Sequence, residues 1–224
     1  MITNRDEKMS RFFSKVYLWM FIGLLISGAV AYYTAVTPSM LKLVSSSFMI
    51  IVILELVVVI AFSFLRKKVS PEVAKILFIV YSALSGLTLS SIFLVYKIGS
   101  IGMVFLASAI MFGMLAIYGY VTKTNLASFG KILIFGILAI IIMSIIYMFV
   151  LISSFGIIIS IVSIVLFLGL TAYDMQNLKE IYSYYENDEK ELSKASIYGA
   201  LDLYLDFINI FLNLLNLFGS RRDW

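Results

Sequence analysis

Seven apolar stretches constrain the fold of this chain more than any other feature of its sequence. A helix needs about 20 apolar residues to cross the roughly 30 Å of hydrocarbon in a bilayer. With 62% hydrophobic and 13% charged residues, the 224-residue chain carries more apolar surface than one soluble core buries. We therefore predict an all-α integral membrane protein, a single domain over residues 1–224, with seven transmembrane helices near 16–36, 45–65, 73–96, 101–121, 131–152, 155–180 and 195–218.

The charges between these stretches predict an orientation. The charged segment 1–15 lacks the small-residue cleavage site of a signal peptide, so we expect it to be a retained cytoplasmic tail. The longest polar connection is expected over 180–194, between helices six and seven. Alternate sides carry 13 and 4 Lys and Arg residues, which places the N-terminus in the cytoplasm and the C-terminus outside. The terminal pair Arg221 and Arg222 favours an alternative, in which a re-entrant seventh segment returns the C-terminus to the cytoplasm.

Composition excludes several function classes. The net charge of +4 comes from Lys and Arg in short blocks between apolar runs, which indicates a lipid bilayer as the partner and no nucleic acid. The chain has no Cys and no His. Thiol nucleophiles, Ser-His and His-zinc chemistry and His-ligated haem are thereby excluded, and we predict no resident cofactor.

Four carboxylates lie inside the predicted spans: Glu55, Asp174, Asp202 and Asp206. A lone ionised carboxylate in hydrocarbon costs at least a few kcal/mol, so each must be protonated, hydrated, hydrogen-bonded or bound to a cation. At about 1.5 Å of rise per residue, Glu55, Asp174 and Asp206 all lie on the order of 15 Å from the cytoplasmic end. We predict that they lie at a common depth, with Asp202 one turn closer to the cytoplasm.

The last span carries one polar stripe. Asp202, Asp206, Asn209, Asn213 and Asn216 follow one another at spacings of four and three, which places them on one helix face. Such a stripe faces the bundle interior or a water-filled path, because lipid leaves polar groups unsatisfied. We predict a polar pathway along the three Asn residues; the alternative is that Asn and protonated Asp only join helices.

A pair of carboxyl groups within hydrogen-bonding reach shares one proton, because both cannot ionise at short range. Such a pair across helices six and seven would act as a latch, closed when singly protonated and open when doubly ionised. Two ionised oxygen ligands are also what a hard cation such as Ca²⁺ prefers. One device would then serve as pH sensor and as cation site.

Residues of helices six and seven resemble the signature of the Bax inhibitor-1 family, the transmembrane Bax-inhibitor-motif proteins, in its bacterial branch. The segments that carry the resemblance are YDMQNLK at 173–179, ALDLYLDFIN at 200–209 and FLNLL at 211–215, with ILE at 53–55, RKK at 66–68 and Ser85-Gly86. The resemblance implies seven helices with the seventh central, in a bacterial inner membrane. It also implies a pH-sensitive calcium leak controlled by two aspartates, here Asp174 and Asp206, which would also be the calcium ligands.

Three other residues are expected to modulate the switch, the first of them because of the resemblance. Arg66 is expected to engage the first aspartate, Asp174, from helix two. Asp202 departs from the family pattern, in which its position is small or polar, and is expected to modulate the switch. Glu55 is a weaker candidate, for which a hydrogen bond between helices would be a sufficient role.

Three function classes follow. The leading interpretation is a passive leak for Ca²⁺, gated by protonation of the aspartate pair. The alternatives are a proton-coupled Ca²⁺/H⁺ secondary transporter, which also uses midplane carboxylates, and a non-transporting membrane interaction protein. We predict no enzyme: an aspartyl protease dyad is usually accompanied by a Gly-x-Gly-Asp segment, which the chain lacks.

Overall fold

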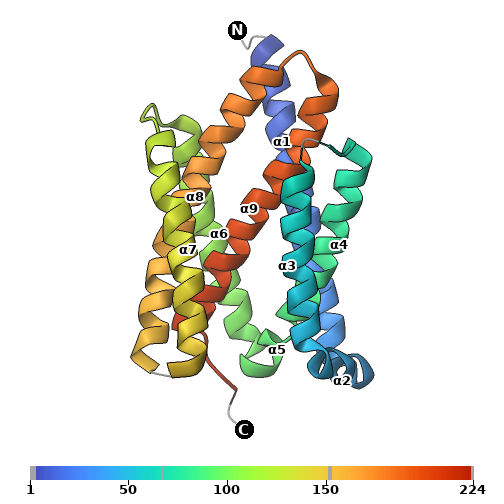
Figure 1. Cartoon of the computed structure of the whole chain (residues 1–224), viewed down its shortest axis with the longest axis vertical. Helices are drawn as coiled ribbons and strands as arrows, with labels where there is room; N and C mark the ends of the chain where they lie inside the picture. The colour runs from blue at the N-terminus through green and yellow to red at the C-terminus, as the bar shows by residue number, and fades with distance from the viewer. Residues whose placement is uncertain (1–3, 67, 151–152, 223–224) are drawn as a thin grey trace. The chain divides into compact units, whose positions relative to one another are not determined.

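The computed structural model describes residues 4–66, 68–150 and 153–222, and in these ranges the chain is helical with no β-strand (Figure 1). The helices, in chain order, are α1 (Asn4–Val36), α2 (Pro38–Ser46), α3 (Phe48–Leu65), α4 (Pro71–Leu89), α5 (Ile92–Val95), α6 (Ile98–Val121), α7 (Ala127–Val150), α8 (Ser153–Tyr185) and α9 (Glu189–Phe218). Seven of their segments are long and apolar enough to cross a membrane. The prediction of an all-α membrane protein with seven spans is confirmed.

The chain divides into two compact units. Among the described residues, unit 1 contains 4–96, 182–204 and 222, and unit 2 contains 97–181 and 205–221. Unit 1 therefore holds α1 to α5 with the end of α8 and the first half of α9. Unit 2 holds α6, α7, most of α8 and the second half of α9. Of the seven candidate spans, α9 has the largest buried share, 50% of its most apolar window, because it supplies core residues to each unit.

Close packing in unit 1 depends on small residues. Ser82 and Gly86 of α4 and Ser90, which caps its C-terminal end, are buried, as expected for a stripe that lets two helices approach. A Cβ atom at Gly86 would stand 2.8 Å from the carbonyl oxygen of Ser27 on α1, too close for backbone that cannot move aside. Here α1 lies directly against α4.

The connection between α8 and α9 is much shorter than expected. We predicted a polar connection over 180–194, but α8 continues to Tyr185 and α9 begins at Glu189, so this prediction is wrong. Glu, Lys and Leu favour helix, and Asp188 caps α9: its Oδ1 accepts from the backbone N–H of Glu191 at 3.0 Å. Polar sequence here marks helix ends that extend past the apolar part of the spans.

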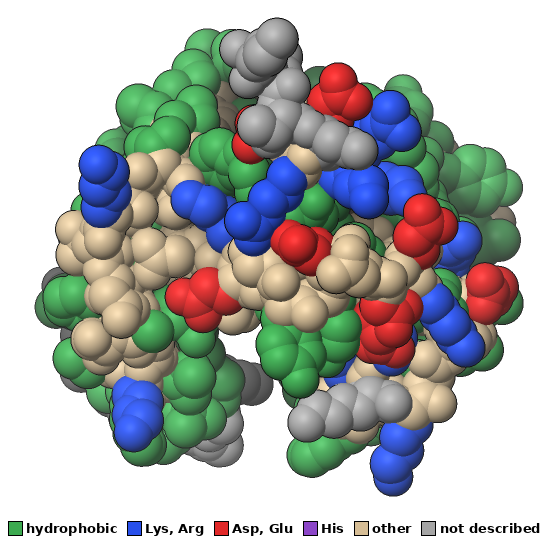
Figure 2. All heavy atoms as spheres, turned by 90° about the horizontal axis from the view of Figure 1, so that it is seen from above, with side chains coloured by type: hydrophobic (Ala, Val, Ile, Leu, Met, Phe, Trp, Pro, Cys, Tyr) green, Lys and Arg blue, Asp and Glu red, His purple; other side chains and the backbone are tan. Residues whose placement is uncertain are grey.

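The first helix also begins earlier than the apolar pattern indicated. It starts at Asn4, so most of the predicted tail 1–15 is helical. Figure 2 looks onto the end of the molecule that carries the N-terminus and shows Lys, Arg, Asp and Glu side chains gathered there. Within unit 1, this charge includes an ion pair between Arg5 Nε and Glu186 Oε2 at 2.9 Å.

Candidate functional site

The four predicted carboxylates fall into both units. Glu55 and Asp202 belong to unit 1, and Asp174 and Asp206 belong to unit 2. The common depth predicted for three of them therefore stays a prediction. The two sets are described in turn, beginning with unit 1.

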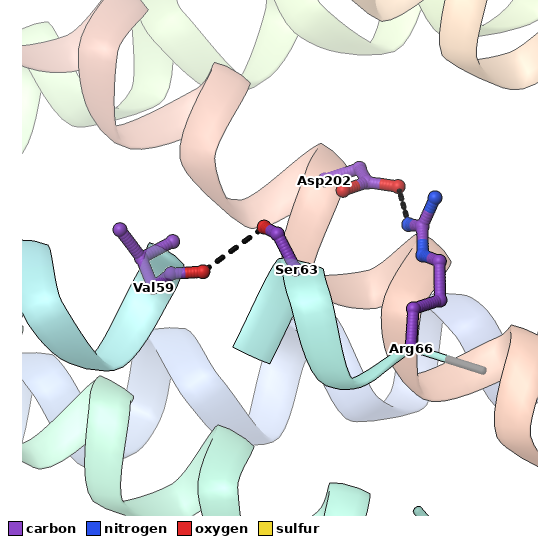
Figure 3. Close-up of polar contacts among 4 residues, drawn as sticks. All are labelled: Val59, Ser63, Arg66 and Asp202. Carbon is purple, nitrogen blue, oxygen red and sulfur yellow. Dashed lines mark hydrogen bonds and ion pairs between the residues drawn. The ribbon is translucent and has the colours of Figure 1, made fainter. Parts of the chain in front are cut away.

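In unit 1, Asp202 on α9 is paired with Arg66 at the C-terminal end of α3. The Nη2 group of Arg66 donates to Oδ2 of Asp202, and Figure 3 shows the two side chains reaching toward each other. The nearby Ser63 hydroxyl donates a hydrogen bond within α3, to the carbonyl oxygen of Val59 at 2.9 Å. Within unit 1 the partner of Arg66 is Asp202; the engagement of Asp174 by Arg66 that the resemblance implied stays a prediction, because Asp174 belongs to unit 2.

Aromatic rings fix the geometry of this pair. The Arg66 guanidinium lies over the ring of Tyr198, 4.9 Å from its centroid. Tyr198 in turn packs on the buried ring of Phe62, with 4.5 Å between centroids. Because Tyr198 precedes Asp202 by one turn of α9, a single helix face offers the arginine both a ring and a carboxylate.

The Arg66–Asp202 pair is expected to contribute modestly to stability. The two side chains are 43% and 33% exposed, and partly exposed pairs contribute about 0.2–1 kcal/mol. A double-mutant cycle with Arg66→Gln and Asp202→Asn, read from thermal unfolding in detergent at neutral pH, should show coupling of that size. The coupling should vanish in acid, where Asp202 is protonated, and fall at high salt. Additive single mutants at neutral pH and low salt would contradict the pairing.

Glu55 joins α3 to α4 through a hydroxyl group. Its Oε2 accepts from Thr88 Oγ1 at 2.9 Å. The hydrogen bond between helices that we expected for Glu55 is present. The carboxyl group of Glu55 and the hydroxyl group of Thr88, from two helices, thus satisfy each other within apolar spans.

A second group of hydroxyls in unit 1 was not anticipated. The Oη of buried Tyr204 on α9 lies 2.6 Å from Oγ of Ser27 on α1, and this serine also donates to the carbonyl of Ser82 at 2.7 Å. The tyrosine lies two residues after Asp202, but helical period alone gives no sign of a serine partner on α1.

In unit 2, Asp206 is almost completely buried. Its exposed fraction is 3%, and the neighbouring α9 residues Phe207 and Ile210 are also buried. Phe207 packs edge-on against Phe105 and Phe112 of α6, with centroids 5.1 and 5.7 Å apart. Asp206 is thus a buried carboxyl group whose neighbour on the same helix, Phe207, belongs to an aromatic cluster.

Asp174 on α8 is positioned by the residues around it in the motif 173–179. The Gln176 side chain spans the connection between α6 and α7: its Nε2 donates to the carbonyl of Thr124 at 2.8 Å and its Oε1 accepts from the N–H of Leu126 at 2.7 Å. Lys179 donates to the carbonyl of Tyr120, at the end of α6, at 2.6 Å. The motif therefore connects α8 by hydrogen bonds to the end of α6 and to the α6–α7 connection.

The three Asn residues of the predicted polar stripe make mostly local hydrogen bonds. Asn209 and Asn213 each donate to the carbonyl four residues earlier on α9, at 2.8 Å, and Asn216 donates to Ser160 Oγ of α8 at 2.9 Å. The last of these joins two helices. A pathway along the three residues stays a prediction.

The described residues include no group of three or more His, Cys, Asp or Glu side chains placed to hold a metal ion. The calcium site predicted at Asp174 and Asp206 stays a prediction; it would need further ligands from neutral oxygens or water, which Ca²⁺ also accepts.

Comparisons with known proteins cover nearly the whole chain. A family model described as "Inhibitor of apoptosis-promoting Bax1" matches residues 9–223. The inner membrane protein YbhL of Escherichia coli K12 is 41% identical over 218 residues, covering 96% of this chain and 93% of that protein. An uncharacterized protein of Borreliella burgdorferi is 41% identical over 96% of this chain and 94% of its own length, and an uncharacterized membrane protein of Streptococcus pyogenes is 31% identical over 99% and 97%.

Proposed function

The chain belongs to the Bax inhibitor-1 family of membrane proteins, and from this premise we propose that it is a pH-dependent calcium leak channel. Ionisation of Asp174 and Asp206, on α8 and α9, opens a path for Ca²⁺, and protonation closes it. The protein is multi-pass and, like its E. coli relative, resides in the inner membrane, with its N-terminus in the cytoplasm and its C-terminus outside.

The observation that carries this proposal is the burial of Asp206 inside unit 2, the unit that also contains Asp174. A carboxyl group in apolar surroundings is stable when neutral and costly when ionised, unless a cation balances its charge. A proton and Ca²⁺ then compete for the same oxygens. Acidification favours the proton, so the leak falls as pH falls.

The other carboxylates tune this switch. Asp202 lies one turn before Asp206 on α9 and carries a negative charge balanced by Arg66. Replacing Asp202 with Asn removes that negative charge and leaves the Arg66 charge unpaired. Both changes favour ionised carboxylates nearby, so the midpoint of the flux should move toward lower pH while flux persists. Glu55, hydrogen-bonded to Thr88, would act through the packing of α3 on α4.

Calcium flux into proteoliposomes that contain a calcium-sensitive dye tests the proposal. We expect influx at neutral pH well above that of empty liposomes, and a steep fall on mild acidification. A leak runs without proton movement, whereas a Ca²⁺/H⁺ transporter would acidify or alkalinise the lumen in proportion to the calcium moved. Flux equal to that of empty liposomes at every pH would favour the non-transporting interaction protein. Catalysis has no role in this proposal.

A further inference from the structure

Unit 2 contains a cavity that lies apart from the proposed aspartate switch, although its lining includes Asn216, the last residue of the predicted polar stripe. Its volume is about 580 Å³, within the roughly 300–1,000 Å³ typical of small-molecule sites. It lies where α7 ends, α8 begins and α9 ends, far along these helices from the motif around Asp174. Its lining residues come from all three segments: Tyr147, Gly156, Ile157, Ile161, Asn216, Leu217, Phe218 and Arg221.

One wall of the cavity is apolar and uncovered. Ile157, Ile161 and Phe218 are 53%, 49% and 71% exposed, so the apolar wall is open to the surrounding hydrocarbon. Gly156 helps to make the space, because a Cβ atom there would stand 3.0 Å from the Tyr147 hydroxyl. Hydrocarbon chains gain by covering such a wall.

The other wall is polar and basic. Arg221 brings a guanidinium group, Tyr147 a hydroxyl group, and Asn216 an amide that also donates to Ser160 at 2.9 Å. The candidate span of α8 begins at Phe155, and that of α9 ends at Phe218. These groups therefore lie at the level where acyl chains meet headgroups.

A ligand that fits both walls has an anionic head and a hydrocarbon tail. Free phosphate would leave the apolar wall uncovered. A lipid without phosphate would leave the guanidinium without a counter-charge, and the phosphate of a zwitterionic lipid such as phosphatidylcholine is already balanced by that lipid's own ammonium group. Arginine matches phosphate oxygens in geometry as well as in charge. We propose that this cavity binds one anionic phospholipid, with its phosphate at Arg221 and the first part of an acyl chain against Ile157, Ile161 and Phe218.

Native mass spectrometry of the full chain in detergent tests this site. Phosphatidylglycerol is compared with phosphatidylcholine of the same acyl chains. We expect one retained phosphatidylglycerol and weaker retention of phosphatidylcholine. Arg221→Gln should lower phosphatidylglycerol affinity about fivefold, the effect of about one Arg charge near a lipid surface. The matched control Arg222→Gln changes the next residue, which does not line the cavity, and should leave affinity unchanged.

Two further measurements make the outcome decisive. Gly156→Leu places a side chain in the cavity and should lower retention of both lipids, with circular dichroism as the check of folding. If that variant fails to fold, the pair Arg221→Gln and Arg222→Gln still decides, because both residues are exposed. Equal retention in these two variants overturns the proposal. So does displacement of phosphatidylglycerol by inorganic phosphate at comparable concentration, which would make the site a phosphate site.

Discussion

Replacing Asp206 with Asn is expected to hold calcium flux at its low, acidic level at every pH. The Asn side chain has the shape of a protonated Asp and cannot ionise, so the variant mimics the closed state. A single protonation changes the open fraction by up to about tenfold per pH unit, and the variant should lose that dependence. The measurement is calcium influx into proteoliposomes from mildly acidic to mildly alkaline pH. Asp174→Asn should behave in the same way.

Two Asp→Asn controls make the same chemical change elsewhere on or beside α9. Asp202→Asn, one turn away, should keep flux and shift its midpoint toward lower pH. Asp188→Asn should match the unmodified protein, because Asn caps a helix as well as Asp does and position 188 precedes the span. Unchanged flux and unchanged pH dependence in Asp206→Asn would show that this residue is not the switch. Complete loss of flux in Asp202→Asn would instead make Asp202 a primary site residue.

Replacing Gly119 with Ala is expected to destabilise unit 2 by about 1–3 kcal/mol. A Cβ atom at Gly119 on α6 would collide with the backbone of Ala172 on α8, including its carbonyl oxygen. Backbone inside a helix cannot rotate aside as a side chain does, so α6 and α8 must separate. Thermal unfolding of the detergent-solubilised protein measures the loss.

Gly113 is the matched control on the same helix. No atom lies within 4 Å of the Cβ position there, so Gly113→Ala should stay within about 1 kcal/mol of the unmodified protein. Equal stability of the two variants would contradict the close contact of α6 and α8. Asp174 follows Ala172 by two residues, so a displaced α8 should also disturb calcium flux in Gly119→Ala but not in Gly113→Ala.

The membrane character of the chain could be predicted from local properties of its sequence. The free energy of transferring a run of about 20 apolar residues into lipid depends mainly on the residues of that run. It can therefore be judged without knowing which helices the run packs against. The same reasoning identified Asp174, Asp202, Asp206 and Glu55, since a carboxylate within an apolar run can be recognised before its partners are known. Helix ends were predicted less well, because α1 and α8 continue through polar residues that favour helix without being apolar.

The partners of these side chains depend on the tertiary structure. Helical period shows which residues share a face of α9, and it placed Asp202 and Asp206 on the same one. It does not show that Arg66 pairs with Asp202, that Tyr204 meets Ser27, or that Gln176 spans the α6–α7 connection. Each of these contacts joins segments at least 50 residues apart. Burial in lipid is a property of one segment, whereas a hydrogen bond requires two segments, and only the packing of the helices decides which two meet.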